Sequence, residues 1–265
     1  MNKIEVAVLH EAHSCPGGMM MFLAKLTQRG HNIKNMDDLL KLYNGSMHKH
    51  KTATAVAALP HGTIKRFAPI TIAIVGASRR FLAQARTHQV GITYVSASLQ
   101  YSDYSGEADF AVPYEITKAD ADEGTTKYTD MYLAGCQRDM DEYAELAKVA
   151  GNDAAGYKAP QGLRNILIIQ ANHESWMNFI RARGCSRNTT ETQYVTLRIW
   201  EELLKTEDGE EMFHFAGPDC MYGMCREGKM CCGKPLRKFV DEARTIQGAS
   251  IPRLIIEDKW PLLNK

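Results

Sequence analysis

The sequence predicts an α/β protein in which short strands and helices precede a run of longer helices. Alternating or continuous apolar residues, typical of strands, recur in the first 115 residues, and three- or four-residue apolar spacing, typical of helices, dominates after residue 120. The 265 residues could form one large domain or two small ones. Because no repeat, low-complexity tract or Gly/Ser-rich linker divides them, a single domain over residues 1–265 is the simpler interpretation.

The first half of the chain should alternate strands with short helices. Residues 67–75 are apolar and β-branched, which predicts a buried strand. Ser78 can serve as an N-cap, so a helix should begin there and run to about residue 88. The other predicted strands are 3–9, 92–98 and 109–114, and the other predicted helices are 19–28, 36–42 and 52–59.

Long helices are predicted in the second half. The longest pattern covers residues 124–150, where Cys136 and Met140 share one face. Pro160 interrupts the pattern before a second helical segment. The remaining predicted elements are helices at 163–183, 189–205 and 237–246 and a strand-like stretch at 252–256.

Composition and charge exclude several classes of protein. With 32 Lys and Arg against 31 Asp and Glu, the net charge of +1 lacks the basic excess of a dedicated nucleic-acid binder. No stretch of 18 apolar residues is present to span a membrane, and the first residues lack the layout of a signal peptide. We therefore expect a soluble, cytoplasmic protein that binds neither nucleic acid nor a membrane.

The seven cysteines are unevenly spaced, and four of them fall in residues 220–232. An odd number of cysteines without an export signal predicts reduced thiols. The spacing Cys220-x4-Cys225-x5-Cys231-Cys232 is wider than the Cys-x2–4-Cys pairs of zinc sites. We expect a reduced or redox-labile loop and no metal; a metal site is the alternative.

Three polar segments are candidates for ligand binding. The Gly-Ala-Ser-Arg turn at 76–79 could bind an anion through free N–H groups. Residues 96–105 are rich in hydroxyls and aromatic rings that suit a phosphate or a base, and Arg181, Arg183 and Arg187 suit phosphate or carboxylate. Each segment also has an ordinary explanation: a capped turn, a polar loop and a solvated basic face.

Five segments in chain order share the pattern of one enzyme family. Residues 60–79 join an apolar strand to Gly-Ala-Ser-Arg, and residues 172–183 hold Asn172 and Arg183 in one helix. The other segments are 26–30, 88–91 and 216–234. Together they resemble the flavin-dependent thymidylate synthase family over most of the chain.

The resemblance implies one domain with an antiparallel-rich sheet flanked by long helices, in which residues 216–234 form a Cys-rich loop. It further implies reductive C5-methylation of a pyrimidine nucleotide, dUMP to dTMP. FAD would be the cofactor, and NADPH and methylenetetrahydrofolate would be co-substrates. Family members are homotetramers with active sites at subunit interfaces.

The resemblance also implies roles for individual residues. Those expected at the catalytic centre are Ser102 and Arg183. Those expected to bind the nucleotide are Gln89, Gln100, Ser102, Tyr104 and Arg183. Those expected to bind the cofactor are Arg79, His88, Tyr94, Asn172 and Arg187.

Several charged family positions are replaced. Without gaps, the Arg-His-Arg of the family signature falls on residues 92–94, and its last Arg falls on Tyr104. A flavin-contacting His becomes Phe67, a helix Arg becomes Glu174, and another Arg becomes Gly156. Each lost charge-assisted hydrogen bond costs about 1.5–3 kcal/mol. The candidate replacements are Arg79, Arg86, His88, Lys158 and Arg187.

Two further hypotheses follow from these replacements. The same fold could act on another pyrimidine nucleotide or one-carbon group, since neutral side chains replace phosphate-binding arginines. Alternatively, a non-catalytic paralogue could serve as a binding subunit, because Glu174 would repel a flavin pyrophosphate.

Overall fold

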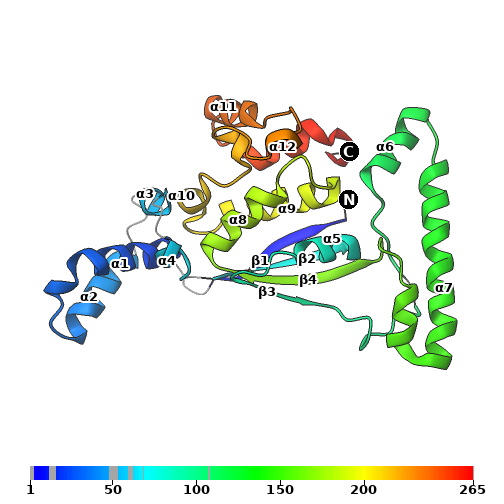
Figure 1. The fold of residues 1–265 in the computed structure, drawn as a ribbon, viewed down its shortest axis with the longest axis horizontal. Coiled ribbons are helices and arrows are strands. Elements are labelled where there is room, and N and C mark those ends of the chain that lie inside the picture. Colours follow the sequence, from blue (N-terminus) through cyan, green and yellow to red (C-terminus); the bar gives the residue numbers. More distant parts are fainter. Residues whose placement is uncertain are drawn as a thin grey trace.

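The computed structural model describes residues 3–11, 16–47, 53–58, 62–67, 69–106 and 108–264. A four-stranded antiparallel sheet with strand order β1-β2-β4-β3 lies at its centre (Figure 1). The strands are β1 (Glu5–Glu11), β2 (Ile70–Ser78), β3 (Ile92–Ser96) and β4 (Arg164–Ala171). This sheet and its surrounding helices confirm the predicted fold class.

Twelve α-helices lie in the described ranges, joined by short 3₁₀ turns. Those before the last strand are α1 (Pro16–Arg29), α2 (Met36–Met47), α3 (Ala53–Ala58), α4 (Gly62–Lys65), α5 (Arg79–Ala85), α6 (Tyr114–Glu123) and α7 (Lys127–Ala155). Those after it are α8 (His173–Arg183), α9 (Thr190–Leu204), α10 (Gly209–Phe213), α11 (Arg237–Thr245) and α12 (Ile251–Lys259). None of these helices has the length and apolar character that a membrane crossing requires.

Helices α5, α8 and α9 lie on one side of the sheet (Figure 1). The residues of β2 and β4 that face these helices are buried. Because successive side chains of a strand point to opposite faces of the sheet, the residues between them are more exposed. On the opposite face Leu9, Val75, Val95 and Ile166 are exposed. The sheet therefore buries one face within the chain and leaves apolar side chains on the other.

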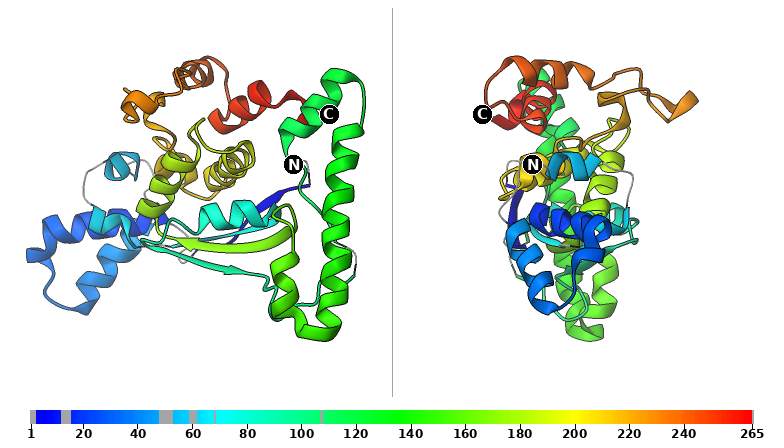
Figure 2. Two further views of the ribbon diagram at one scale, coloured as in Figure 1. Left: turned by 45° about the vertical axis from the view of Figure 1, so that its right-hand side comes forward. Right: turned by 90° about the vertical axis from the view of Figure 1, so that its left-hand side faces the viewer.

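The two ends of the molecule carry separate helical pairs. Helices α1 and α2 project at one end of the sheet, and α6 and α7 stand at the other (Figures 1 and 2). Helix α7 has its own small core, in which Cys136, Met140 and Tyr143 pack on Phe110 and Leu163. This packing confirms the face predicted for the longest helix.

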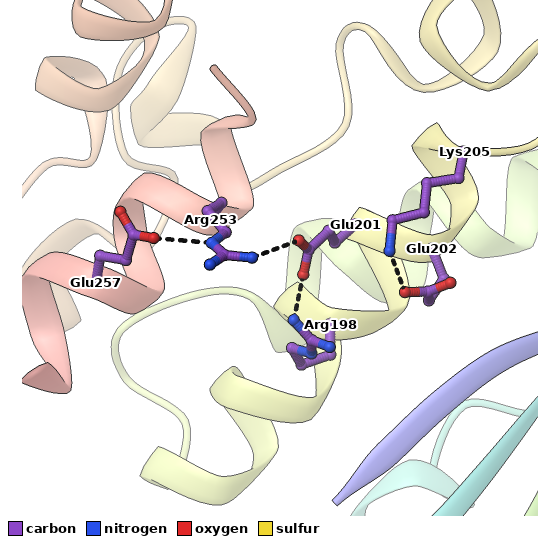
Figure 3. A network of polar contacts seen from close by, with 6 residues as sticks. All are labelled: Arg198, Glu201, Glu202, Lys205, Arg253 and Glu257. Atoms are coloured by element: carbon purple, nitrogen blue, oxygen red, sulfur yellow. Dashed lines mark hydrogen bonds and ion pairs between the residues drawn. The ribbon is translucent and has the colours of Figure 1, made fainter. Parts of the chain in front are cut away.

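The C-terminal helix α12 packs on α9, on the side away from the sheet. Figure 3 shows the polar contacts at this junction, where Arg253 reaches Glu257 at 2.7 Å and Glu201 at 3.7 Å. Glu201 also accepts from Arg198 at 2.5 Å. Burial of apolar residues on α12 and the edge-on contact of Tyr194 with Trp260 supply the rest of the interface. Docking of α12 fixes the position of Lys259 at its end.

Two sequence predictions of local structure are wrong. Residues 163–183 do not form one helix: β4 ends at Ala171, and α8 begins at His173. The strand shows the two-residue burial alternation that its neighbours β2 and β3 require, and this overrides the apolar run that suggested a helix. Residues 252–256 are helical, because Pro252 occupies the first turn, where a missing N–H costs nothing.

Other boundaries shift without changing the architecture. The expected strand at 109–114 contributes only a single bridge, Phe110 to Leu163, and the chain then enters α6, which the sequence did not predict. The Ser78 cap is confirmed, since its hydroxyl accepts from the Phe81 N–H at 3.1 Å. Cys15, Thr52 and Leu59 of the predictions, and residues 60–61 and 68 of the family resemblance, lie outside the described residues.

Candidate functional site

The chain after α5 runs along one face of α8. Residues at four-residue spacing on a helix share a face, and Ser175, Phe179 and Arg183 do so here. The Ser175 hydroxyl donates to the Val90 carbonyl at 3.0 Å, and the Phe179 ring lies 5.2 Å from the His88 ring. The Arg183 guanidinium donates to Thr87 Oγ1. The segment 87–91 is thereby held along the whole length of the helix.

Tyr94 fixes the start of this segment from β3. Its hydroxyl lies 2.8 Å from the Ala85 carbonyl and 2.7 Å from the His88 carbonyl, so one proton is shared by two acceptors. Burial raises the pKa of Tyr94 to about 12, which keeps the hydroxyl protonated. Burial and the nearby charge of Arg183 lower the pKa of His88, so the imidazole is neutral at pH 7.

Arg183 is the charged centre of this group. One terminal nitrogen donates to Asn188 Oδ1 at 3.1 Å and the other donates to Thr87. Its Nε is buried and has no hydrogen-bond partner in the described part of the chain. Burial lowers the pKa of Arg183, but a guanidinium stays charged. A half-buried cation with a spare donor suits an anionic or carbonyl oxygen of a ligand.

Asn172 lies at the other end of α8, about 16 Å from Arg183 by the rise of a helix. Its side-chain oxygen accepts from the Ser175 N–H at 3.0 Å, so it caps the helix. Its amide nitrogen lies close to Gly91, which has a φ of +69°. The expected cofactor residue therefore also shapes the turn that leads into β3.

Glu174 does not carry an uncompensated charge. Arg66, just after α4, donates to it at 2.8 Å, and Lys65 also lies within its electrostatic reach. The net charge of this group is positive. The repulsion of a flavin pyrophosphate expected from Glu174 is thus offset by two cations that the family pattern did not identify.

A second group of predicted residues lies around the start of α5. Arg79 is close enough to Tyr104 and Arg86 for their charges to act on it, and burial lowers the pKa of Arg79. Arg86 donates to the Ser96 hydroxyl at 2.7 Å. The Tyr104 N–H donates to the Tyr143 hydroxyl at 3.3 Å, which ties the loop after β3 to α7. Two arginines and a tyrosine thus meet beside the end of β3.

The structure shows no contact between Arg183 and the remaining predicted site residues that it describes. Gln89 is exposed on the segment 87–91, and Arg187 is exposed on the turn between α8 and α9. Ser102 and Gln100 lie in the loop after β3, where their N–H groups donate to the Ser98 carbonyl and hydroxyl at 3.1 Å. No hydrogen bond joins Ser102 to Arg183 in the described ranges.

The sequence did not identify the polar contacts between α5 and α9. Gln84 Oε1 accepts from Thr189 at 3.3 Å and from Thr192. Glu191 accepts from the Ser78 N–H at 2.8 Å and from its hydroxyl at 2.5 Å. Glu191 also lines a cleft of about 1140 Å³ between α6, α7 and the start of α9. The Ser78 cap was the one sequence signal for this contact.

The residues at the start of α8 fit the phosphates of a flavin nucleotide. The start of α8, with Lys65 and Arg66 beside it, provides positive charge for a pyrophosphate. At the other end of α8, the buried Nε of Arg183 has no partner among the described residues and offers a donor to a second ligand.

Comparisons with known proteins identify the family. A family model described as "Thymidylate synthase complementing protein" matches residues 12–206. The chain is 28% identical over 179 residues to the flavin-dependent thymidylate synthase of Clostridium tetani, covering 62% of this chain and 69% of the relative. It is 27% identical over 184 residues to that of Geobacter sulfurreducens, covering 68% and 74%.

Solved structures share the fold. One is Thymidylate Synthase X from Helicobacter pylori with FAD and dUMP, with a TM-score of 0.57, 14% identity, and coverage of 80% of this chain and 98% of that one. Another is the UMP/dUMP methylase PolB from Streptomyces cacaoi bound with 5-Br dUMP, with a TM-score of 0.58, 16% identity, and coverage of 81% and 96%.

Proposed function

Because the chain belongs to the flavin-dependent thymidylate synthase family, a family of thymidylate synthase-like methyltransferases, we propose that it methylates C5 of dUMP to give dTMP. The methyl carbon would come from methylenetetrahydrofolate and the reducing equivalents from NADPH. FAD, when bound, supplies the hydride chemistry that this conversion needs.

The observation that carries the proposal is the state of Arg183. Its guanidinium is half-buried and ordered by Thr87 and Asn188, and its buried Nε has no partner among the residues that the structure describes. Burial of an unsatisfied donor costs about 1–3 kcal/mol, and a ligand oxygen would remove that cost. We assign this donor to the pyrimidine nucleotide.

Other residues of the chain would bind and orient the reactants. The first turn of α8, Lys65 and Arg66 would hold the phosphates of the flavin, with Asn172 beside its ring. His88 is neutral, so it can accept or donate a hydrogen bond without adding charge. Ser102, Gln100, Tyr104 and Gln89 are proposed to complete the nucleotide site, and Arg79 and Arg187 to provide further cofactor contacts.

A homotetramer would bring such separated groups together. The exposed sheet face with Leu9, Val75, Val95 and Ile166 supports this part of the proposal, since apolar patches on soluble proteins mark interfaces. Ser102 and Arg183, which are not joined within one chain, could then meet across subunits. We further propose that the assembly works in the cytoplasm.

A second candidate keeps the reaction but changes the nucleotide. Thr87 and Tyr94 place neutral hydroxyls next to Arg183, so the cluster holds fewer cations than the family signature implies. UMP, which differs from dUMP by one ribose hydroxyl, is the alternative substrate of this second candidate.

A turnover assay tests both candidates. The purified protein is incubated with FAD, NADPH, methylenetetrahydrofolate and either dUMP or UMP, and products are separated by chromatography. Formation of dTMP that requires every component supports the first proposal. Methylation of UMP alone supports the second, and no methylated product from either nucleotide contradicts both.

A further inference from the structure

Five cysteines lie on or near the turn that follows Arg183 at the end of α8. Cys185 lies on the turn between α8 and α9, and the others belong to the Cys-rich loop, residues 216–234. The Cys225 and Cys231 thiols form a hydrogen bond, and Cys220 lies within electrostatic reach of Cys225. Cys185 lies within similar reach of Cys220 and Cys232. All five are free thiols.

The backbone around these thiols has a repeated geometry. The N–H of Gly233 donates to Cys231 Sγ at 3.5 Å, and that of Lys234 donates to Cys232 Sγ at 3.4 Å. The N–H groups of Arg187 and Glu227 donate in the same way to Cys185 and Cys225. Each donor is two residues after its cysteine. Such N–H···S bonds stabilise thiolates and orient them when they bind a metal.

After Met221 the Cys-rich loop lacks a core that could hold its shape. Its regular structure consists of two short turns, Asp219–Met221 and Gly228–Met230. No residue from Tyr222 to Pro235 is buried. A segment with so little apolar burial needs another source of order, and a metal ion is the usual one where cysteines cluster.

Lys259 provides an independent observation. Its ammonium group is half-buried beside Cys185 and Cys232 and donates to Ser186 Oγ at 2.6 Å and Gln193 Oε1 at 3.2 Å. In the described ranges no carboxylate forms a direct ion pair with Lys259, although Asp258 lies within electrostatic reach. A nearby negative charge stabilises a half-buried cation, and Zn²⁺ with four thiolates carries a net charge of −2.

We propose that Cys185, Cys220, Cys225 and Cys232 bind one structural Zn²⁺ ion. Among the described residues, no three possible ligands are already close enough to hold an ion together. The proposal therefore requires the thiols to turn about χ1, which moves a sulfur atom by about 3 Å, as they close around the ion. Four protons leave as the four Zn–S bonds form, and no oxidant is needed. The ion joins the turn that follows Arg183 to the Cys-rich loop.

Cys231 is the matched control. It is adjacent to Cys232 and also accepts an N–H bond, but it is exposed, whereas Cys232 is half-buried and faces Cys185 and Lys259. Two adjacent cysteines rarely bind the same ion, so the proposal predicts opposite results for the two positions.

Metal analysis of the full chain, purified without chelator, tests the proposal. We expect roughly one zinc per chain in the wild type and in C231S, and a loss of at least tenfold in C185S, C220S, C225S and C232S. Absence of zinc from the wild type even after zinc is supplied would overturn the proposal. Iron with inorganic sulfide, or a Cys225–Cys231 disulfide found by mass spectrometry, would also overturn it.

A second measurement avoids reliance on variants that could fail to fold. The wild type is stripped with a chelator and loaded with Co²⁺, whose absorption at about 600–750 nm lies beyond that of flavin. Intense bands of a tetrahedral thiolate site that zinc displaces are expected. Weak bands typical of oxygen ligands would contradict the assignment.

Discussion

Arg183 at the end of α8 donates a hydrogen bond to Thr87 just after α5, although 96 residues separate them. This contact closes a series along one helix face, in which Phe179 lies against His88 and Ser175 bonds to Val90. The series positions the part of the predicted site that contains Arg183, His88 and Tyr94. The predictions below concern this region and its supports.

Arg183→Ala should weaken nucleotide binding. Loss of one charge-assisted hydrogen bond costs about 1.5–3 kcal/mol, which corresponds to roughly 10- to 150-fold in the dissociation constant for dUMP. Calorimetric titration measures this change. Arg181→Ala is the control, because Arg181 is exposed on the same helix and contacts Asn178. Equal affinities of wild type and R183A would refute the assignment.

Ser102→Ala should reduce turnover more than it disturbs folding. The Ser102 hydroxyl is half-buried, and its backbone N–H already bonds to Ser98, so the loop keeps its shape without the side chain. We expect a lower kcat and a Tm within about 1–2 °C of the wild type. Ser105→Ala in the same loop is the control. A lower Tm with unchanged kcat would reverse the claim.

Arg66→Ala should weaken FAD binding by leaving Glu174 without its closest counter-charge. The pair is 2.8 Å apart, and a bare carboxylate near the flavin phosphates is repulsive. Quenching of flavin fluorescence measures the affinity. The double variant R66A/E174Q should recover part of it, because the repulsive charge is then removed while the direct contribution of Arg66 to phosphate binding stays lost. If R66A and the double variant bind FAD equally weakly, Arg66 acts directly and not through Glu174.

Gly91→Ala should destabilise the protein by more than about 1 kcal/mol. Gly91 has a φ of +69°, and a Cβ there would lie 2.4 Å from Ser175 Oγ and 3.0 Å from Asn172 Nδ2. Urea unfolding measures the change. Gly106→Ala, with nothing within 4 Å of the added carbon, should be close to neutral. Equal stability of the two variants would show that segment 87–91 is not held against α8.

His173 should make the fold less stable in mild acid. It is fully buried, its Nε2 lies 2.7 Å from the Met212 carbonyl, and burial lowers its pKa from 6.5 to about 4. The unfolded chain therefore binds a proton that the native state does not. This destabilisation is absent above about pH 6.5 and grows by up to about 1.4 kcal/mol per pH unit as pH falls towards 4.

The His173→Gln variant isolates this effect. Its unfolding free energy should fall less than that of the wild type between about pH 7 and pH 5, by about 2 kcal/mol. Urea unfolding at both pH values provides the comparison. Parallel pH dependences would show that His173 is not the group responsible.

Local sequence signals predicted most of the fold and little of the site. Ser78, as an N-cap residue, predicted the start of α5, and the four-residue spacing of Cys136 and Met140 predicted α7. The run at 164–171 was ambiguous because continuous apolar residues fit a strand or a buried helix, and only pairing with β2 and β3 decides between them.

The site depended on contacts between distant segments. Arg66 and Glu174 are 108 residues apart in the sequence, so no local sequence pattern predicts their ion pair. Thr87 was missed because the family signature, aligned without gaps, fell on residues 92–94. The sequence alone did not group Cys185 with the cysteines of the Cys-rich loop, because only folding brings the end of α8 to that loop.

The most direct test of the account is an absorption spectrum of the purified protein between about 350 and 500 nm, before and after addition of FAD and then dUMP. The account predicts flavin bands that stay with the protein after gel filtration and shift when dUMP is added. A colourless protein that takes up no FAD would contradict the proposed flavin chemistry.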